Sequence, residues 1–73
     1  MTLRAVTTLW RLGWENDSLA CVIYRDARGL QMHVESPAGT ILSEPFELEP
    51  RMMARSKALR AALVRRGWQE IQF

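Results

Sequence analysis

The chain has 73 residues, of which 48% are hydrophobic and 25% are charged, and ten Lys and Arg side chains against eight Asp and Glu give a net charge of +2. This composition is typical of one ordinary globular domain over residues 1–73 and excludes a disordered or collagen-like chain. A chain this short buries only about 60% of the surface that its unfolded form exposes, so self-association would add useful burial.

The cellular compartment is inferred from three features: cysteine content, secretory signals and membrane-spanning segments. Its one cysteine, Cys21, allows no disulfide within the chain and lies in an apolar run, which suits a reducing environment. The first ten residues hold no apolar stretch of the length found in secretory signals, and no segment approaches the roughly 18 apolar residues that span a bilayer. We therefore expect a cytoplasmic protein with no membrane partner.

Four β-prone runs occupy the first two thirds of the chain, and they are rich in Val, Ile, Thr and aromatic residues. They read VTTLWRLGW, LACVIYR, LQMHVE and TILSEPF. Turn-forming segments separate them at residues 15–18, 26–29 and 36–39, where Asn, Asp, Ser, Pro and Gly gather. Short turns between runs of strand length predict an antiparallel meander of four strands.

Alternation predicts which side chains share a side of each strand. In the first run Trp10, Leu12 and Trp14 share a side, and Leu9 faces the other way. In the third run the side chains divide cleanly into an apolar set, Leu30, Met32 and Val34, and a polar set, Gln31, His33 and Glu35.

The second run is apolar on both sides, so its facing depends on the hairpin at Asp26–Gly29. A two-residue loop pairs Cys21 with Val34 and places Leu19, Cys21 and Ile23 beside the apolar set of the third run. A three-residue loop with Gly29 as a bulge pairs Val22 with Val34 instead. The sequence leaves both registers open.

A helix is predicted from about Pro50 to Arg66. Pro50 suits the first turn, where its missing N–H costs nothing, and Gly67 suits the left-handed conformation that ends a helix. Helical spacing gives a narrow stripe suited to lying on a sheet, which comprises Met52, Leu59 and Leu63 with Ser56 and Ala62 beside it.

After the helix, residues 68–73 alternate again, so that Ile71 and Phe73 could extend a fifth strand. Trp68 is expected to fold back on the last helical turn. The predicted fold is therefore α+β: an antiparallel sheet of four strands, or five, with one α-helix packed on one face.

Six bases and no acids lie between Arg51 and Arg66, which raises the question of nucleic-acid binding. Phosphate binding favours bases gathered on one exposed face. Helical spacing instead distributes them along both flanks of the apolar stripe and the back of the helix, where long stems border a core. We favour that structural role. The competing hypothesis is a nucleic-acid site that comprises Arg55, Lys57, Arg60, Arg65 and Arg66.

Little in the sequence points to catalysis or to a cofactor. His33 is the single histidine and Cys21 the single thiol, so one chain cannot build a multi-His or multi-Cys metal site. The register with a three-residue loop would place these two residues on one face of adjacent strands, which is the arrangement of a Cys–His nucleophile. We expect no enzyme, no metal and no cofactor.

One helix covers only one face of a sheet, and the other face keeps apolar side chains in either register. This arrangement favours a homo-oligomer through the sheet, most simply a homodimer, or another protein partner. We therefore predict a small non-catalytic interaction module, with salt-sensitive nucleic-acid binding as the alternative.

Three segments of the sequence resemble segments of other small proteins. LW near the start, CVIYRDARGLQMHV as a hairpin and ALRAAL followed by GW resemble short uncharacterised bacterial proteins with a strand-meander-then-helix layout. That resemblance implies a fold and no activity. The order of elements is also similar to small dimeric single-stranded-DNA-binding domains of the transcriptional coactivator kind. Their basic, aromatic-bearing strands are not matched here, because this meander holds more acids than bases.

Overall fold

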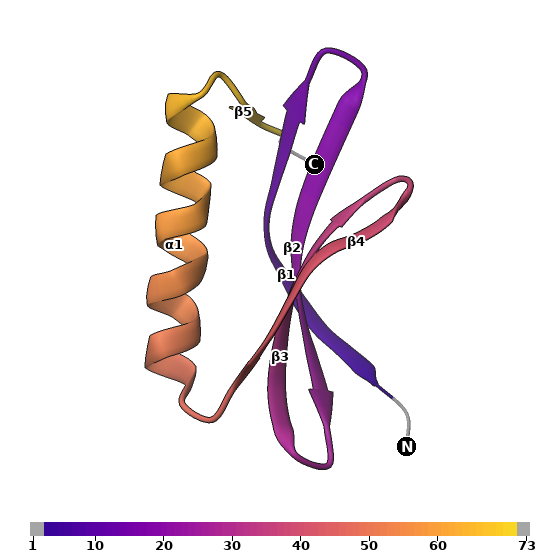
Figure 1. Cartoon of the computed structure of the whole chain (residues 1–73), viewed down its shortest axis with the longest axis vertical. Coiled ribbons are helices and arrows are strands. Elements are labelled where there is room, and N and C mark those ends of the chain that lie inside the picture. Colours follow the sequence, from indigo (N-terminus) through magenta and orange to yellow (C-terminus); the bar gives the residue numbers. More distant parts are fainter. Residues whose placement is uncertain (1–2, 72–73) are drawn as a thin grey trace.

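The computed structural model of the chain describes residues 3–71. They form an antiparallel sheet of five strands with one helix along one of its sides (Figure 1). The strand order across the sheet is β4-β3-β2-β1-β5, which confirms the predicted α+β fold. The elements are β1 (Arg4–Trp14), β2 (Asp17–Asp26), β3 (Gly29–Ser36), β4 (Gly39–Phe46), α1 (Glu49–Arg65) and β5 (Gln69–Glu70).

The β2–β3 hairpin adopts the register with a two-residue loop. Cys21 pairs with Val34 and Asp26 pairs with Gly29. Oδ1 of Asp26 accepts hydrogen bonds from the backbone N–H of Arg28 at 2.7 Å and of Gly29 at 3.1 Å. Gly29 has a φ of 140°, a conformation that residues with a side chain rarely adopt. This two-residue turn therefore fixes the register, and the register places the Cys21 side of β2 toward α1.

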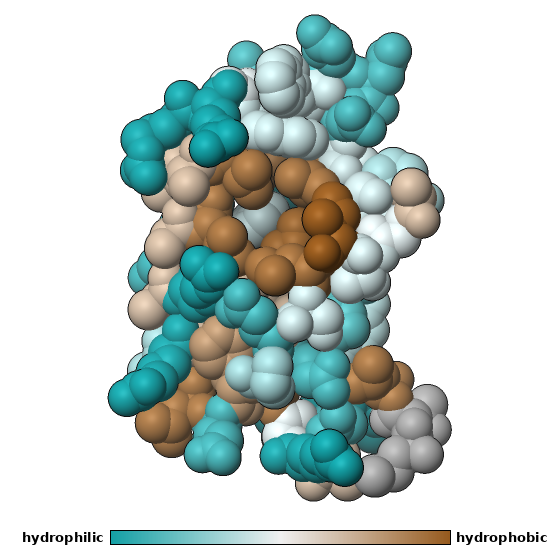
Figure 2. All heavy atoms as spheres, viewed as in Figure 1, coloured by the Kyte–Doolittle hydropathy of each residue, from teal (hydrophilic) through white to brown (hydrophobic). Residues whose placement is uncertain are grey.

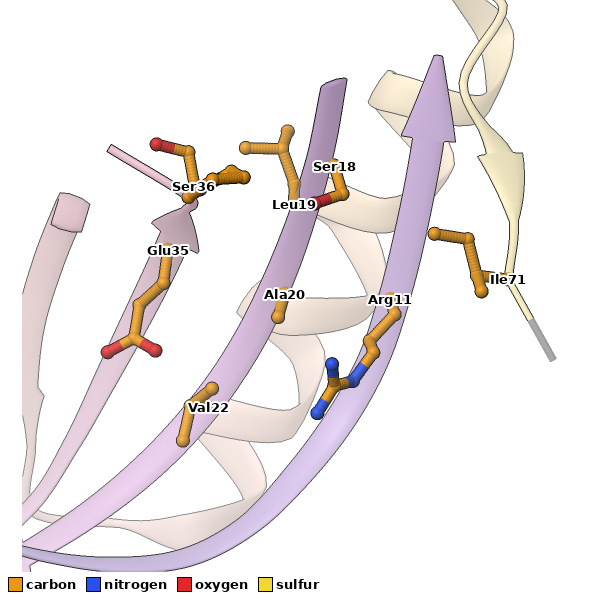
Figure 3. A pocket seen from close by; sticks show the side chains of 9 residues that line it. Arg11, Ser18, Leu19, Ala20, Val22, Glu35, Ser36 and Ile71 are labelled. Carbon is orange, nitrogen blue, oxygen red and sulfur yellow. The ribbon is translucent and has the colours of Figure 1, made fainter. Parts of the chain in front are cut away.

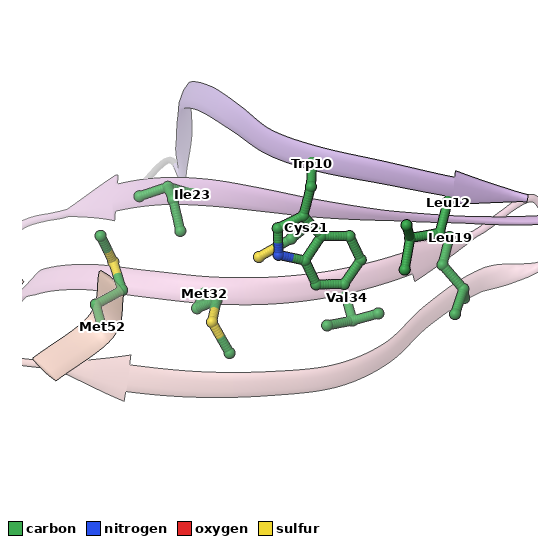
Figure 4. Packing of buried hydrophobic residues seen from close by; sticks show 8 residues of the cluster. All are labelled: Trp10, Leu12, Leu19, Cys21, Ile23, Met32, Val34 and Met52. Atoms are coloured by element: carbon green, nitrogen blue, oxygen red, sulfur yellow. The ribbon is translucent and has the colours of Figure 1, made fainter. Parts of the chain in front are cut away.

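The core lies between the sheet and α1 (Figure 4). Leu12, Cys21 and Met32 are completely buried there, and they come from three adjacent strands. Trp10 donates its indole Nε1–H to the backbone oxygen of Ser56 at 3.1 Å, which joins β1 to the middle of α1. The buried cluster comprises Trp10, Leu12, Leu19, Cys21, Ile23, Met32, Val34 and Met52.

Two bulges interrupt β1. Its register against β2 shifts between Ala5 and Thr7 and again between Thr8 and Trp10, so Val6 and Leu9 are extra residues. An extra residue disrupts strict alternation. Leu9 consequently packs against the buried cluster, and the prediction that it faces away from the Trp10 side is wrong.

The helix follows the predicted stripe. Met52 and Ser56 are buried, and Leu59 and Leu63 are partly buried against the core. Its start lies one residue before the predicted start at Pro50. The helix covers one face of the sheet, as predicted.

The helix ends in a Schellman motif at Gly67, which has a φ of 113°. The N–H of Gly67 bonds to the carbonyl of Val64, and the N–H of Trp68 bonds to that of Leu63, both at 3.1 Å. The Trp68 ring then meets the Trp14 ring edge-on, with centroids 5.7 Å apart. The predicted helix stop is therefore confirmed.

The predicted fifth strand forms, but it is short. Residues 69–70 of β5 pair with Leu12 and Gly13 of β1. The N–H of Ile71 bonds to the carbonyl of Arg11 at 3.0 Å. Phe73, which was predicted to extend this strand, lies outside the described residues.

α1 runs along one side of the twisted sheet (Figure 1). α1 begins beside the end of β4 at one edge, and the segment that follows it pairs with β1 near the other edge. In the hairpin half of β4, between Gly39 and Leu42, Thr40 and Ile41 are exposed and Leu42 is only partly buried.

Candidate interaction surfaces

Two of the five bases predicted for nucleic-acid binding pair with acids on the sheet. Arg55 donates to the carboxylate of Glu44 in β4 through two hydrogen bonds, at 3.1 and 3.0 Å. These bonds lower the pKa of Glu44 and raise the pKa of Arg55. Nε of Arg60 lies 3.2 Å from Oε1 of Glu70 in β5. Both arginines therefore connect a flank of α1 to the sheet.

The other three predicted bases, Lys57, Arg65 and Arg66, are exposed. None of them forms an ion pair with another of residues 3–71. Arg65 and Arg66 lie at the carboxyl end of α1, where positive charge complements the helix dipole. Lys57 lies about 12 Å from them along the helix axis. These bases are thus available to solvent at two separate places.

The candidate nucleophile pair is separated by the sheet. Cys21 is completely buried on the α1 side, and burial raises the pKa of its thiol to about 11. His33 pairs with Val22, the neighbour of Cys21, and so lies on the opposite face. The observed register therefore prevents the contact that the alternative register would have allowed.

A hydrogen-bonded cluster lies on the face opposite α1, called here the open face. The Tyr24 hydroxyl donates to Oε2 of Glu35 at 2.6 Å, and the Tyr24 ring lies 4.6 Å from the His33 ring. Nε2 of His33 is 3.0 Å from Oε1 of Gln31 and 3.2 Å from Oγ of Ser43. His33 is only 9% exposed, so these neighbours shield it without an overlying helix.

This cluster extends to the β2–β3 turn. Nε2 of Gln31 donates to Oδ2 of Asp26 at 2.7 Å. The pKa of Asp26 is lowered, chiefly by the backbone N–H of Arg28. Sequence reasoning placed Gln31, His33 and Glu35 on one side but missed their contacts. The available signal was that every residue of this set carries a hydrogen-bonding side chain.

A shallow trough of about 320 Å³ crosses the upper part of the open face (Figure 3). Ala20 and Val22 of β2 form its floor, and Arg11 of β1 and Glu35 of β3 flank it. The small floor residues lie between larger neighbours, which accounts for the depression. Glu35 is already bound by Tyr24.

The hairpin half of β4 carries two adjacent apolar side chains. We call it the β4 corner, and its apolar residues are Ile41 and Leu42. Leu42 pairs with Val34 of the core, and Ile41 is the extra residue of the β3–β4 bulge. Ile41 is 63% exposed. Figure 2 shows hydrophobic side chains gathered around a hollow between the upper half of α1 and the sheet.

The β4 corner was missed at the level of sequence. The adjacent pair Ile41 and Leu42 breaks the alternation of apolar and polar residues, and this was the signal that could have located it. A bulge sets two residues of one strand against one of its partner, so the strand keeps pairing while an additional apolar side chain stays outside the core.

The described residues offer no metal centre and no spanning helix. Among residues 3–71, no group of three or more His, Cys, Asp or Glu side chains lies close enough to hold a metal ion. No helix formed by this part of the chain is long and apolar enough to cross a membrane.

Comparison of the chain with protein-family models, with curated proteins and with solved structures finds no match.

Proposed function

We propose that the chain is a non-catalytic interaction module that works as a homodimer. The observation that carries this proposal is an excess of accessible surface. The chain exposes 5428 Å², whereas a compact monomer of its 8.4 kDa mass exposes ~4600 Å². The difference of roughly 800 Å² is the area that one partner buries in a standard protein interface.

The shape of the molecule agrees with this excess. Its radius of gyration is 12.3 Å, compared with about 11 Å for a compact domain of this length. Several large hydrophobic side chains also remain more than a third exposed, among them Trp14, Ile41 and Val64. Burial against a second copy would remove this surface from water and stabilise both copies.

A non-catalytic role is supported by the separation of Cys21 from His33, because a nucleophile and its base must lie within hydrogen-bond distance. Cys21 is in addition buried with a raised pKa, whereas reactive cysteines are exposed and have lowered values.

Light scattering after size-exclusion chromatography tests the proposal directly. We expect a mass twice the 8.4 kDa of the chain at micromolar concentration, with dissociation on dilution. A mass of one chain at every concentration would disprove the homodimer.

Nucleic-acid binding is the second candidate, and the exposure of Lys57, Arg65 and Arg66 favours it. Three phosphate contacts to a single strand would give a logarithmic salt slope of about −2. Fluorescence anisotropy of a labelled mixed-sequence oligonucleotide at low and physiological salt measures this slope. Binding that disappears in a folded Arg65→Glu, Arg66→Glu variant would establish this function, and no binding at low salt would exclude it.

A further inference from the structure

We infer that a second copy of this chain docks on the β4 corner, so that the interface lies beside α1 and not on the open face. This inference rests on the proposed homodimer and specifies its surface. It follows from three features of the described residues: where the exposed apolar side chains lie, how the β4 edge is built, and how charge is distributed around the corner.

The first feature is that the two uncovered surfaces differ in chemistry. On the open face, the side chains of Tyr24, Gln31 and His33 are joined to hydrogen-bonding partners. At the β4 corner, Ile41 is 63% exposed and Leu42 is only partly buried. Such side chains gain from burial, whereas the open-face groups already have partners. The β4 corner is therefore the better docking surface.

The second feature concerns the way in which a partner can approach. β4 is an edge strand, and an exposed edge can pair with a strand of another chain. Here a bulge at Ile41 bends the strand, and Pro45 has no N–H to donate. Both features oppose extension of the sheet. The partner is thus expected to pack through side chains, with Ile41 and Leu42 against it.

The third feature is the distribution of charge, which favours a second copy as the occupant. The β1–β2 hairpin carries Glu15 and Asp17, and the end of α1 carries Arg65 and Arg66. The contact of Trp14 with Trp68 holds these two segments at the same end of the molecule (Figure 1).

A two-fold axis along the long dimension of the molecule would set the basic helix end of one copy opposite the acidic hairpin of the other. Two-fold dimers repeat each such contact twice, so the charge pairs would act on both sides of the apolar centre. Roughly 800 Å² of excess surface per copy matches the area of such an interface.

The decisive variant is Ile41→Glu, because Ile41 is largely exposed and its replacement leaves the core intact. Val6→Glu is its matched control: Val6 is also the extra residue of a bulge and is 54% exposed, but it lies in β1. Thr8→Glu places the same charge on the open face beside Val22. Sedimentation equilibrium gives the dimer dissociation constant of each, and circular dichroism confirms that each folds.

We expect Ile41→Glu to weaken the dimer by about 100-fold or more, because a charge would be buried in an apolar contact. Val6→Glu and Thr8→Glu should change the dissociation constant by less than about threefold. If the wild type is a dimer and Ile41→Glu leaves it unchanged, the inference is wrong while the proposed homodimer stands. If Thr8→Glu alone dissociates the dimer, the interface lies on the open face. A monomeric wild type overturns both proposals.

Charge exchange provides a second test that does not depend on Ile41. Arg65→Glu with Arg66→Glu should weaken the dimer at low salt by about tenfold. Adding Glu15→Arg and Asp17→Arg to the same chain should restore it, because each copy would then carry the exchanged pair. Failure of the fourfold variant to recover affinity, with the chain still folded, would exclude the proposed two-fold arrangement.

Discussion

On the side of the sheet that α1 covers, alternate residues of the central strands are hydrophobic and buried, whereas on the open face the large side chains are joined by hydrogen bonds. Leu12, Cys21 and Met32 have no exposed surface at all. His33 reaches 9% exposure on the open face with only neighbouring strand side chains around it. An uncovered face of a sheet is therefore not necessarily an apolar one.

In the hairpin half of β4, in contrast, the apolar side chain of Ile41 is 63% exposed. One helix of 17 residues lies along a sheet of five strands, and β4 is an edge strand of that sheet. A partner that covers this corner would complete the helix-side core. The difference between the two faces thus predicts where mutations affect folding and where they affect association.

The largest effect is expected at Leu12. Leu12→Ala removes a completely buried side chain from the covered face, and such truncations cost about 2–5 kcal/mol. Thr8→Ala on the open face should cost no more than about 0.5 kcal/mol. Urea unfolding followed by tryptophan fluorescence at a fixed protein concentration gives both values. Equal losses would show that the two faces contribute alike.

A medium effect is expected at the Tyr24–Glu35 hydrogen bond. Tyr24→Phe removes the hydroxyl that donates to Glu35 at 2.6 Å, and the free energy of unfolding should fall by about 1 kcal/mol. Urea unfolding of the variant measures this loss. No loss would mean that water replaces the hydrogen bond without cost.

Titration tests the same contact without removing the Tyr24 hydroxyl. Tyr24 is the only tyrosine of the chain, so its absorbance reports one group. The hydrogen bond to Glu35 raises the pKa of Tyr24 above its ordinary value of 10.0. Glu35→Gln should move the titration midpoint back toward that value. A midpoint that does not change would contradict the observed pairing.

The sequence predicted the elements of this fold better than their contacts. Local signals define the helix, since Pro50 marks its first turn and Gly67 its end within one residue. Leu9 was misplaced because strict alternation cannot reveal a bulge, which adds a residue without any change in composition. The register of β2 against β3 depended on turn geometry that Asp26 and Gly29 set together.

The surfaces were harder to predict for a related reason. Arg55 pairs with Glu44 and Arg60 pairs with Glu70, and each pair joins elements whose relative position depends on the path of α1. That path results from packing of the entire helix on the sheet, so no local pattern encodes it. The β4 corner depends on the same path, which is why sequence patterning did not locate it.

The smallest effect is expected at Glu44, where a polar pair borders the covered face. Glu44→Gln keeps the shape of the side chain but removes the charge that Arg55 binds. The pair is partly exposed, so its contribution is small, and we expect the melting temperature to fall by about 2 °C at neutral pH. Thermal unfolding by circular dichroism measures the shift.

The pH dependence of that shift identifies its cause. Because hydrogen bonding to Arg55 lowers the pKa of Glu44 in the folded chain, the stabilisation is fully present above the ordinary pKa of 4.5. It is lost as the pH falls through the lowered folded value, because the unfolded chain takes up its proton first. Wild type and Glu44→Gln should therefore converge in stability at acid pH.

Glu47→Gln is the matched control for Glu44→Gln, since Glu47 forms no ion pair with any of residues 3–71. It should show little difference from the wild type at either pH. Gln keeps the two methylenes of Glu, so the substitution tests the carboxylate and not the packing of the stem. A difference for Glu44→Gln that persists below the folded pKa would therefore contradict the assignment of the stabilisation to the charge that Arg55 binds.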